Sequence, residues 1–177
     1  MNTRDIVFLA IIAACVTAAG FITVPLVGAF PLPGMRSLAA AFFYGFFMAV
    51  GALKVRKTGS IFVAALFNGM VLLMMSWLML ANNLIAALIT EALVLILFRG
   101  YRSDRAVLFG AGLYMCMSLP ASFLIAAWLG GPMIGRFLTH PLLVGLIFLG
   151  TAVLSFGGAW AGLRVGRELV KAGVIKS

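Results

Sequence analysis

Apolar residues run through this chain in six long blocks, and short polar or charged segments separate the blocks. A helix needs about 20 mainly apolar residues to cross the hydrocarbon of a bilayer. The pattern therefore predicts an all-α integral membrane protein with six transmembrane helices in one bundle. The predicted spans are Ile6–Gly28, Ser37–Leu53, Ser60–Leu80, Asn82–Phe98, Ala106–Leu129 and Leu142–Leu163.

Composition supports this class. Hydrophobic residues make up 64% of the chain and charged residues only 10%, whereas soluble domains carry about 25% charged residues. The six spans use most of the 177 residues, so we expect a single membrane domain over residues 1–177 without a separate soluble domain.

The net charge of +9 is distributed in a way that orients the spans. With the N-terminus inside, 11 of the 13 basic residues fall in predicted inner segments, and only Arg36 and Arg136 fall outside. The inner ones are Arg4, Lys54, Arg56, Lys57, Arg99, Arg102, Arg105, Arg164, Arg167, Lys171 and Lys176. Positive charge is enriched in cytoplasmic loops, so both termini are predicted to be cytoplasmic. Basic residues clustered between apolar runs do not indicate a nucleic-acid binding groove.

One carboxylate, Glu91, lies inside a predicted span. An ionisable side chain in hydrocarbon costs several kcal/mol unless it finds a partner, a cavity or a proton, so it marks a candidate site. The alternative is a protonated or hydrogen-bonded packing contact between helices. Asn83, Ala87 and Glu91 recur every four residues and share one helix face. Counted from Asn82, Glu91 is expected roughly 13 Å below the outer surface.

Other polar and aromatic residues extend this candidate binding site. The substrate-binding set is Glu91, Asn68, Asn83, Trp77, Tyr114, Arg36, Arg136 and His140. The last three and Trp77 lie in or near the predicted outer segments, two of which are long enough to cover a pocket. Trp77 also fits the aromatic belt at a membrane interface, which is an equally good explanation. Arg36 and Arg136 suit an anionic group on a ligand.

No enzymatic motif accompanies these residues. The chain has no His-Glu-x-x-His site, no Gly-x-Ser-x-Gly elbow and no phosphate-binding Gly-x-x-x-x-Gly-Lys loop. Cys15 and Cys116 both fall within spans, where they are expected to be small buried side chains. We therefore expect no catalytic residue, no metal site and no cofactor on this chain.

Small residues recur every fourth position on two spans, at Ala10, Ala14 and Ala18, and at Gly158, Gly162 and Gly166. Such stripes let another helix approach closely. Each stripe fits either packing inside the bundle or contact with a partner protein.

Taken together, these features resemble the substrate-binding S component of an energy-coupling factor (ECF) vitamin transporter. Six spans with both ends inside and the alanine stripe on the first span carry the topological likeness. The opening Asn2-Thr-Arg-Asp5-Ile resembles the start of several S components. Arg56-Lys57-Thr58-Gly59, together with Thr90-Glu91-Ala92 and Phe98-Arg99, resembles the YkoE/MptD-like branch.

The resemblance implies a binding subunit of an ATP-driven importer in the prokaryotic cytoplasmic membrane. It implies a vitamin or related small molecule bound near the outer surface, a transmembrane coupling subunit, and two cytoplasmic ABC-type ATPases that bind the ATP. The Ala10, Ala14 and Ala18 stripe would contact the coupling subunit. The chain lacks the Met-His start of cobalt and nickel members, which disfavours metal transport, and it has no clear thiamine signature.

Two other functions remain open from the residues alone. The chain would be a proton-coupled exporter protomer if Glu91 carried the proton, or a small membrane-embedded enzyme if Glu91 acted as a general base. The presence or absence of ATPase partners distinguishes the importer from both.

Overall fold

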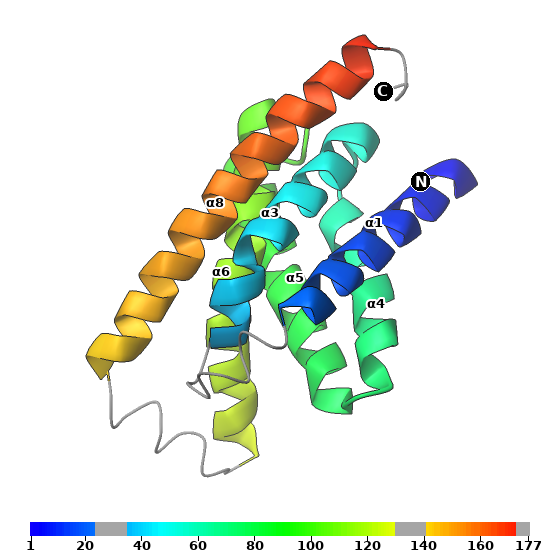
Figure 1. Cartoon of the computed structure of the whole chain (residues 1–177). Coiled ribbons are helices and arrows are strands. Elements are labelled where there is room, and N and C mark those ends of the chain that lie inside the picture. The colour runs from blue at the N-terminus through cyan, green and yellow to red at the C-terminus, as the bar shows by residue number, and fades with distance from the viewer. Residues whose placement is uncertain (24–34, 130–140, 173–177) are drawn as a thin grey trace.

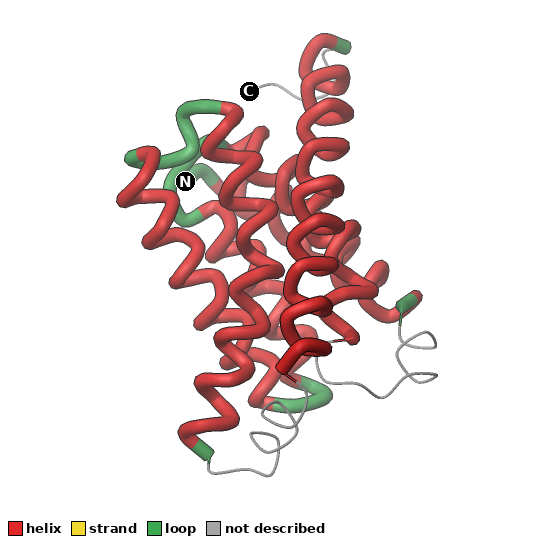
Figure 2. The backbone as a smooth tube through the Cα atoms, turned by 90° about the vertical axis from the view of Figure 1, so that its left-hand side faces the viewer, coloured by secondary structure: helices red, strands yellow, loops and turns green. Residues whose placement is uncertain are grey.

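The computed structural model describes residues 1–23, 35–129 and 141–172, with only the backbone of residues 36 and 141. Within these ranges the chain forms six helices and no strand, and the helices run back and forth along one bundle (Figures 1 and 2). They are α1 (Thr3–Ile22), α3 (Met35–Val55), α4 (Ser60–Leu73), α5 (Trp77–Phe98), α6 (Asp104–Trp128) and α8 (Pro141–Lys171). The apolar core takes residues from all six helices.

Five of these helices are long and apolar enough to cross a membrane: α1, α3, α5, α6 and α8. This agrees with a multi-pass helical membrane protein. The predicted first span, Ile6–Gly28, extends past α1 into positions outside the described residues. The predicted last span ended at Leu163, whereas α8 continues for two more turns to Lys171. Those extra turns carry charged residues, so an apolar criterion alone could not have included them.

The predicted third span, Ser60–Leu80, is wrong in its second half. Helix α4 ends at Leu73 after 14 residues, and α5 begins at Trp77. The break falls where Ser76 caps α5, its Oγ accepting a hydrogen bond from the Leu78 backbone N–H at 3.3 Å. Apolar residues surround this cap on both sides, so hydrophobicity did not reveal it. With 14 residues, α4 is about 21 Å long, and it is not among the helices long enough to cross a membrane.

Close backbone packing joins α3 and α8. A Cβ atom added at Gly158 would collide with the Phe42 carbonyl oxygen, and one at Gly162 would collide with the Phe46 carbonyl oxygen. Gly45 of α3 meets the Ser155 carbonyl in the same way. The glycine stripe of the last span thus packs inside the chain's own bundle, which confirms the first of the two explanations for it.

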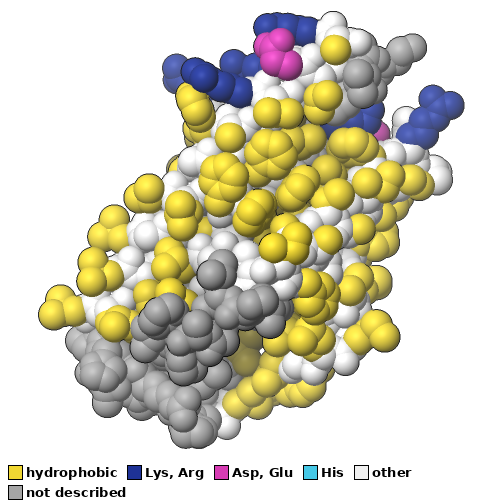
Figure 3. Space-filling view, in the orientation of Figure 1, with side chains coloured by type: hydrophobic (Ala, Val, Ile, Leu, Met, Phe, Trp, Pro, Cys, Tyr) yellow, Lys and Arg dark blue, Asp and Glu magenta, His cyan; other side chains and the backbone are white. Residues whose placement is uncertain are grey.

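The start of α1 and the end of α8 lie at the same end of the bundle (Figure 1). Lysine and arginine side chains gather at this end, while the other described residues visible in this view form a largely apolar surface (Figure 3). Ion pairs connect the turns there: Lys57 Nζ lies 2.9 Å from Asp5 Oδ2, and Arg56 lies 2.8 Å from Asp104. We call this the basic end, and the opposite one the far end.

Candidate functional site

The predicted polar face of α5 points into the bundle. Ala87 is fully buried, Glu91 is only 7% exposed, and Asn83 is half-buried. Asn83 and Glu91 are eight residues apart on the same face, which separates them by about 12 Å along the helix. They consequently contribute to two different buried polar sites.

Glu91 caps the start of α4. Its Oε1 accepts hydrogen bonds from the backbone N–H groups of Ile61 at 3.0 Å and Phe62 at 3.3 Å, and its Oε2 accepts one from Gly59 at 3.2 Å. The first N–H groups of any helix lack partners within the helix, and an acidic group near them is favourable. The N-cap of α4 is Gly59, which has no side chain to do this. A carboxylate from the neighbouring helix takes its place.

This position corrects the expected depth of Glu91. Helix α5 begins at Trp77, so Glu91 lies 14 residues, or about 21 Å, from the start of the helix. It lies closer to the basic end, seven residues before Phe98. The structure therefore matches the packing alternative for Glu91, a hydrogen-bonded contact between two helices.

Tyr101 lies in the turn between α5 and α6 and is 1% exposed. Burial raises the pKa of Tyr101, and the nearby negative charge of Glu91 raises it further. The ring fits beside Gly110, where a Cβ atom would come within 2.8 Å of it. The phenol of Tyr101 thus stays protonated. Its buried ring covers the start of α4, where Glu91 binds, from the side of the basic end.

The second buried site is a cluster of five hydrogen-bonding side chains from five helices. We call it the polar cluster; its members are Thr17 of α1, Tyr44 of α3, Asn68 of α4, Asn83 of α5 and Tyr114 of α6. Asn68 is fully buried at its centre. Such convergence is notable because polar groups inside a membrane protein need partners and commonly mark functional positions.

Hydrogen bonds connect the polar cluster through its two asparagines. Thr17 Oγ1 donates to Asn68 Oδ1 at 2.8 Å. Asn68 Nδ2 donates to Asn83 Oδ1 at 3.2 Å and to Tyr44 Oη at 3.3 Å. Tyr114 Oη donates to the same Asn83 oxygen in a short hydrogen bond. The side chains therefore satisfy one another, which is how a polar group is retained in an apolar interior.

Two stacked aromatic rings form one wall of the polar cluster. The ring centroids of Tyr44 and Tyr114 are 6.2 Å apart, with 17° between the ring planes. Both rings are buried. Flat apolar faces beside amide and hydroxyl groups suit a ligand that combines a ring with hydrogen-bonding atoms.

Further polar contacts continue from the polar cluster along α6. Ser122 Oγ donates to Asn82 Oδ1 at 3.1 Å, and the Oγ atoms of Ser118 and Ser37 lie 3.2 Å apart. Ser118 and Ser122 are one and two turns beyond Tyr114, in the direction of the far end. Polar side chains thus form a path between the polar cluster and the end of the bundle opposite the basic one.

The structure brings together three residues of the predicted binding set, Asn68, Asn83 and Tyr114. Glu91 is elsewhere, at the α4 cap. Trp77 is 56% exposed at the first turn of α5 and points outward, as its aromatic-belt alternative requires. The side chains of Arg36, Arg136 and His140 lie outside the described residues.

Sequence reasoning missed Thr17 and Tyr44. Each is a polar group within a predicted span, the same signal that singled out Glu91, but neither carries a charge. Thr17 lies in the first span, where only the alanines drew attention, and Tyr44 lies between two pairs of phenylalanines that indicate ordinary apolar packing.

The alanine stripe of α1 faces away from the bundle. Ala14 and Ala18 are exposed and Ala10 is half-buried, while Ala13 and Thr17 on the other face are buried. In contrast to the glycine stripe of α8, this one has no helix of the described chain over Ala14 and Ala18.

A cleft of about 570 Å³ lies between α6 and α8 toward their far ends. Its lining is apolar: Leu119, Pro120, Phe123, Leu124, Val144, Gly145 and Phe148. No member of the polar cluster lines it. Among the described residues, no three His, Cys, Asp or Glu side chains lie close enough to hold a metal ion.

Comparison of the chain with protein-family models, with curated proteins and with solved structures gave no match. What the protein does is therefore inferred from its own residues and geometry.

Proposed function

We propose that this protein is the substrate-binding S component of an ECF-type importer in the prokaryotic cytoplasmic membrane. The observation that carries the proposal is the polar cluster, in which five helices direct amide, hydroxyl and phenol groups to one buried point. A purely structural bundle would have no need to bury so many polar groups together, because apolar side chains pack helices at lower cost.

The ligand fitting this site is a small molecule with a flat ring and several hydrogen-bonding atoms, such as a vitamin. In the empty protein, Asn68 is hydrogen-bonded to Tyr44, and Asn83 to Tyr114. When the ligand binds, its polar atoms would replace the two tyrosines as hydrogen-bond partners of the asparagines. This exchange keeps the buried groups satisfied in both the empty and the loaded protein. Opening requires α3 and α6, which carry the two tyrosines, to separate by a ring thickness, roughly the 3.5–4 Å of a carbon–carbon contact.

Import by this chain requires an energy source on other subunits. The proposed partners are a transmembrane coupling subunit and two cytoplasmic ABC-type ATPases that bind ATP. The exposed face of Ala14 and Ala18 supports a helical partner, since small side chains let two helices in a bilayer approach closely. In this proposal the chain itself catalyses no reaction.

The exporter and enzyme alternatives gain no support from Glu91. Both oxygens of its carboxylate are already engaged by backbone N–H groups at the start of α4. A proton carrier or general base must instead present a free oxygen to water or substrate.

The test is purification of the tagged chain from its native membranes in mild detergent, with mass spectrometry of the proteins and small molecules retained. We expect two ATPases, one coupling subunit and a ring-containing metabolite with the unmodified chain. Asn83→Ala should lose the metabolite and keep the partners. Ala14→Trp should keep the metabolite and lose the partners, because the indole displaces a close-packed helix.

Ala92→Trp is the matched control, because Ala92 is an exposed alanine on α5 outside the stripe. It should retain both the metabolite and the partners. The unmodified chain could instead purify without any ATPase, and cells could show efflux that depends on the proton gradient. These two results together would show that the protein is an exporter and not an importer. Loss of folding in Ala14→Trp would place Ala14 inside the bundle and remove the proposed contact.

A further inference from the structure

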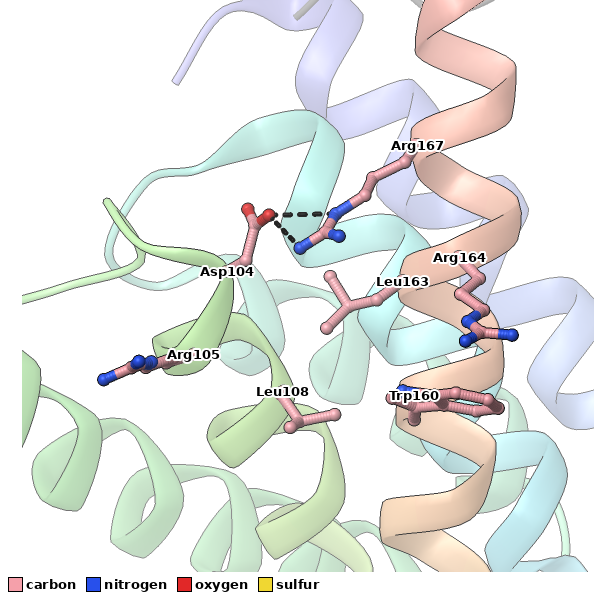
Figure 4. Close-up of a pocket in the computed structure, with 7 residues that line it drawn as sticks. All are labelled: Asp104, Arg105, Leu108, Trp160, Leu163, Arg164 and Arg167. Atoms are coloured by element: carbon pink, nitrogen blue, oxygen red, sulfur yellow. Dashed lines mark hydrogen bonds and ion pairs between the residues drawn. The ribbon is translucent and has the colours of Figure 1, made fainter.

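A second cleft lies between α6 and α8 at the basic end and has a volume of about 260 Å³ (Figure 4). It is separate from the polar cluster. Its lining combines charged, aromatic and aliphatic side chains: Asp104, Arg105, Leu108, Trp160, Leu163, Arg164 and Arg167. Figure 4 shows the leucines between the two helices, Arg167 reaching Asp104, and Arg105 extending from α6 away from α8.

The cleft carries an excess of positive charge. Its one acidic group, Asp104, is shared by two cations: Oδ1 lies 2.8 Å from Arg56, and Oδ2 accepts from Arg167 Nε at 3.0 Å. Arg105 and Arg164 form no ion pair with any described residue. The cleft lining thus holds three arginines and one carboxylate, and this excess of positive charge favours an added anion.

Asp104 also holds one of these groups in place. Its bonds to Arg167 use Nε and one terminal nitrogen, and together they join the start of α6 to α8 (Figure 4). A guanidinium has five N–H donors in a fixed fork. The other N–H groups of Arg167 form no hydrogen bond with a described residue, and its side chain is 55% exposed. Asp104 therefore fixes the position of the Arg167 side chain, and it does not neutralise the positive charge of the whole cleft.

Aromatic and aliphatic groups adjoin the charged ones. Trp160 is 51% exposed, and the Arg164 guanidinium stacks 3.8 Å from the centre of its ring. Tryptophan is enriched where the apolar and polar layers of a membrane meet. Leu108 and Leu163 line the interior. The cleft therefore combines a polar mouth with an apolar floor, as an amphiphile requires.

The apolar part continues along the membrane-facing side of α8. Val153 and Leu149 lie seven and eleven residues before Trp160, so all three share one helix face. Val153 is 66% exposed and Leu149 is 63% exposed. An acyl chain in the bilayer would run along this face while its headgroup occupied the cleft.

We propose that this cleft binds the phosphate of an anionic phospholipid, with Arg164 and Arg167 of α8 as its ligands and Trp160 at the glycerol level. Arginine binds phosphate through paired N–H groups, and basic pockets between helices at the inner membrane surface hold anionic headgroups in this way. The proposal is independent of the transported substrate and of any ATPase partner.

The experiment is native mass spectrometry of the detergent-purified full chain titrated with palmitoyl-oleoyl phosphatidylglycerol or the zwitterionic phosphatidylcholine. We expect the anionic lipid to bind about tenfold more tightly. The double variant Arg164→Gln/Arg167→Gln should weaken its binding about tenfold or more, because each arginine near the headgroup contributes attraction. Arg4→Gln/Arg102→Gln removes two exposed basic residues outside the cleft and is the matched control.

The control variant should bind phosphatidylglycerol as the unmodified chain does. Equal losses in the two double variants would mean that diffuse charge, and not the cleft, attracts the lipid, and would overturn the proposal. Displacement of the lipid by millimolar inorganic phosphate would assign the cleft to a soluble phosphate. If binding of an acidic protein required Arg164 and Arg167 while lipid binding did not, the cleft would be assigned to a protein partner.

Discussion

At the scale of single residues, the buried Glu91 carboxyl binds the backbone N–H groups of a neighbouring helix. It replaces the side-chain cap that Gly59 cannot provide, and it fixes the start of α4 to the middle of α5. Its burial was predictable from its place in an apolar run. Its partners were not, because they are backbone N–H groups about 30 residues earlier in the chain, and backbone groups leave no mark in a sequence.

We expect Glu91→Ala to destabilise the protein by about 2 kcal/mol, since it leaves backbone N–H groups of α4 without acceptors. Glu91→Gln should cost less, because its amide oxygen still accepts from Ile61 or Phe62. Thermal unfolding of the purified protein in detergent, followed by tryptophan fluorescence, measures both. Glu168→Ala is the control: that carboxylate is 71% exposed, and its pairing with Lys171 contributes little. Unchanged stability in Glu91→Ala would exclude the capping role.

At the scale of elements, two stripes of small residues have different roles. The glycines of α8 let the α3 backbone come close, whereas Ala14 and Ala18 of α1 stay on the surface. Spacing alone predicted both stripes equally well. Only the arrangement of helices distinguishes them, because α3 lies against α8 while no described helix covers the outer face of α1.

Gly158→Ala should therefore destabilise the bundle by about 2–3 kcal/mol, because its Cβ meets the rigid Phe42 carbonyl and the helices must separate. Gly157→Ala is a control one residue away, since nothing lies within 4 Å of a Cβ there. It should be neutral or stabilising by up to about 1 kcal/mol, as alanine favours helix over glycine. The comparison uses the same unfolding measurement. Similar effects at both positions would contradict close packing of α3 on α8.

At the scale of the whole molecule, the sequence was sufficient for the class and most helix positions, because long apolar runs and basic turns follow directly from the bilayer as solvent. It was insufficient at the α4–α5 boundary, where Ser76 caps a helix between apolar residues. It also gave only three members of the polar cluster, Asn68, Asn83 and Tyr114. Which polar groups meet depends on helix rotation and neighbours, which hydrophobicity does not determine.

The orientation of the bundle is the prediction that affects every other one. Both ends of the described chain lie at the basic end (Figures 1 and 3), and positive charge favours the cytoplasmic side. In a chain with Cys15 and Cys116 replaced by alanine, we expect a membrane-impermeant maleimide to label Arg136→Cys in intact cells. It should label Ser177→Cys only after permeabilisation. The reverse pattern would mean the opposite orientation in the membrane, with the polar side chains from Tyr114 to Ser122 nearer the cytoplasm and the cleft at the basic end outside. The substrate would then enter the binding site from the cytoplasm, which is incompatible with import. This labelling should therefore precede any transport measurement.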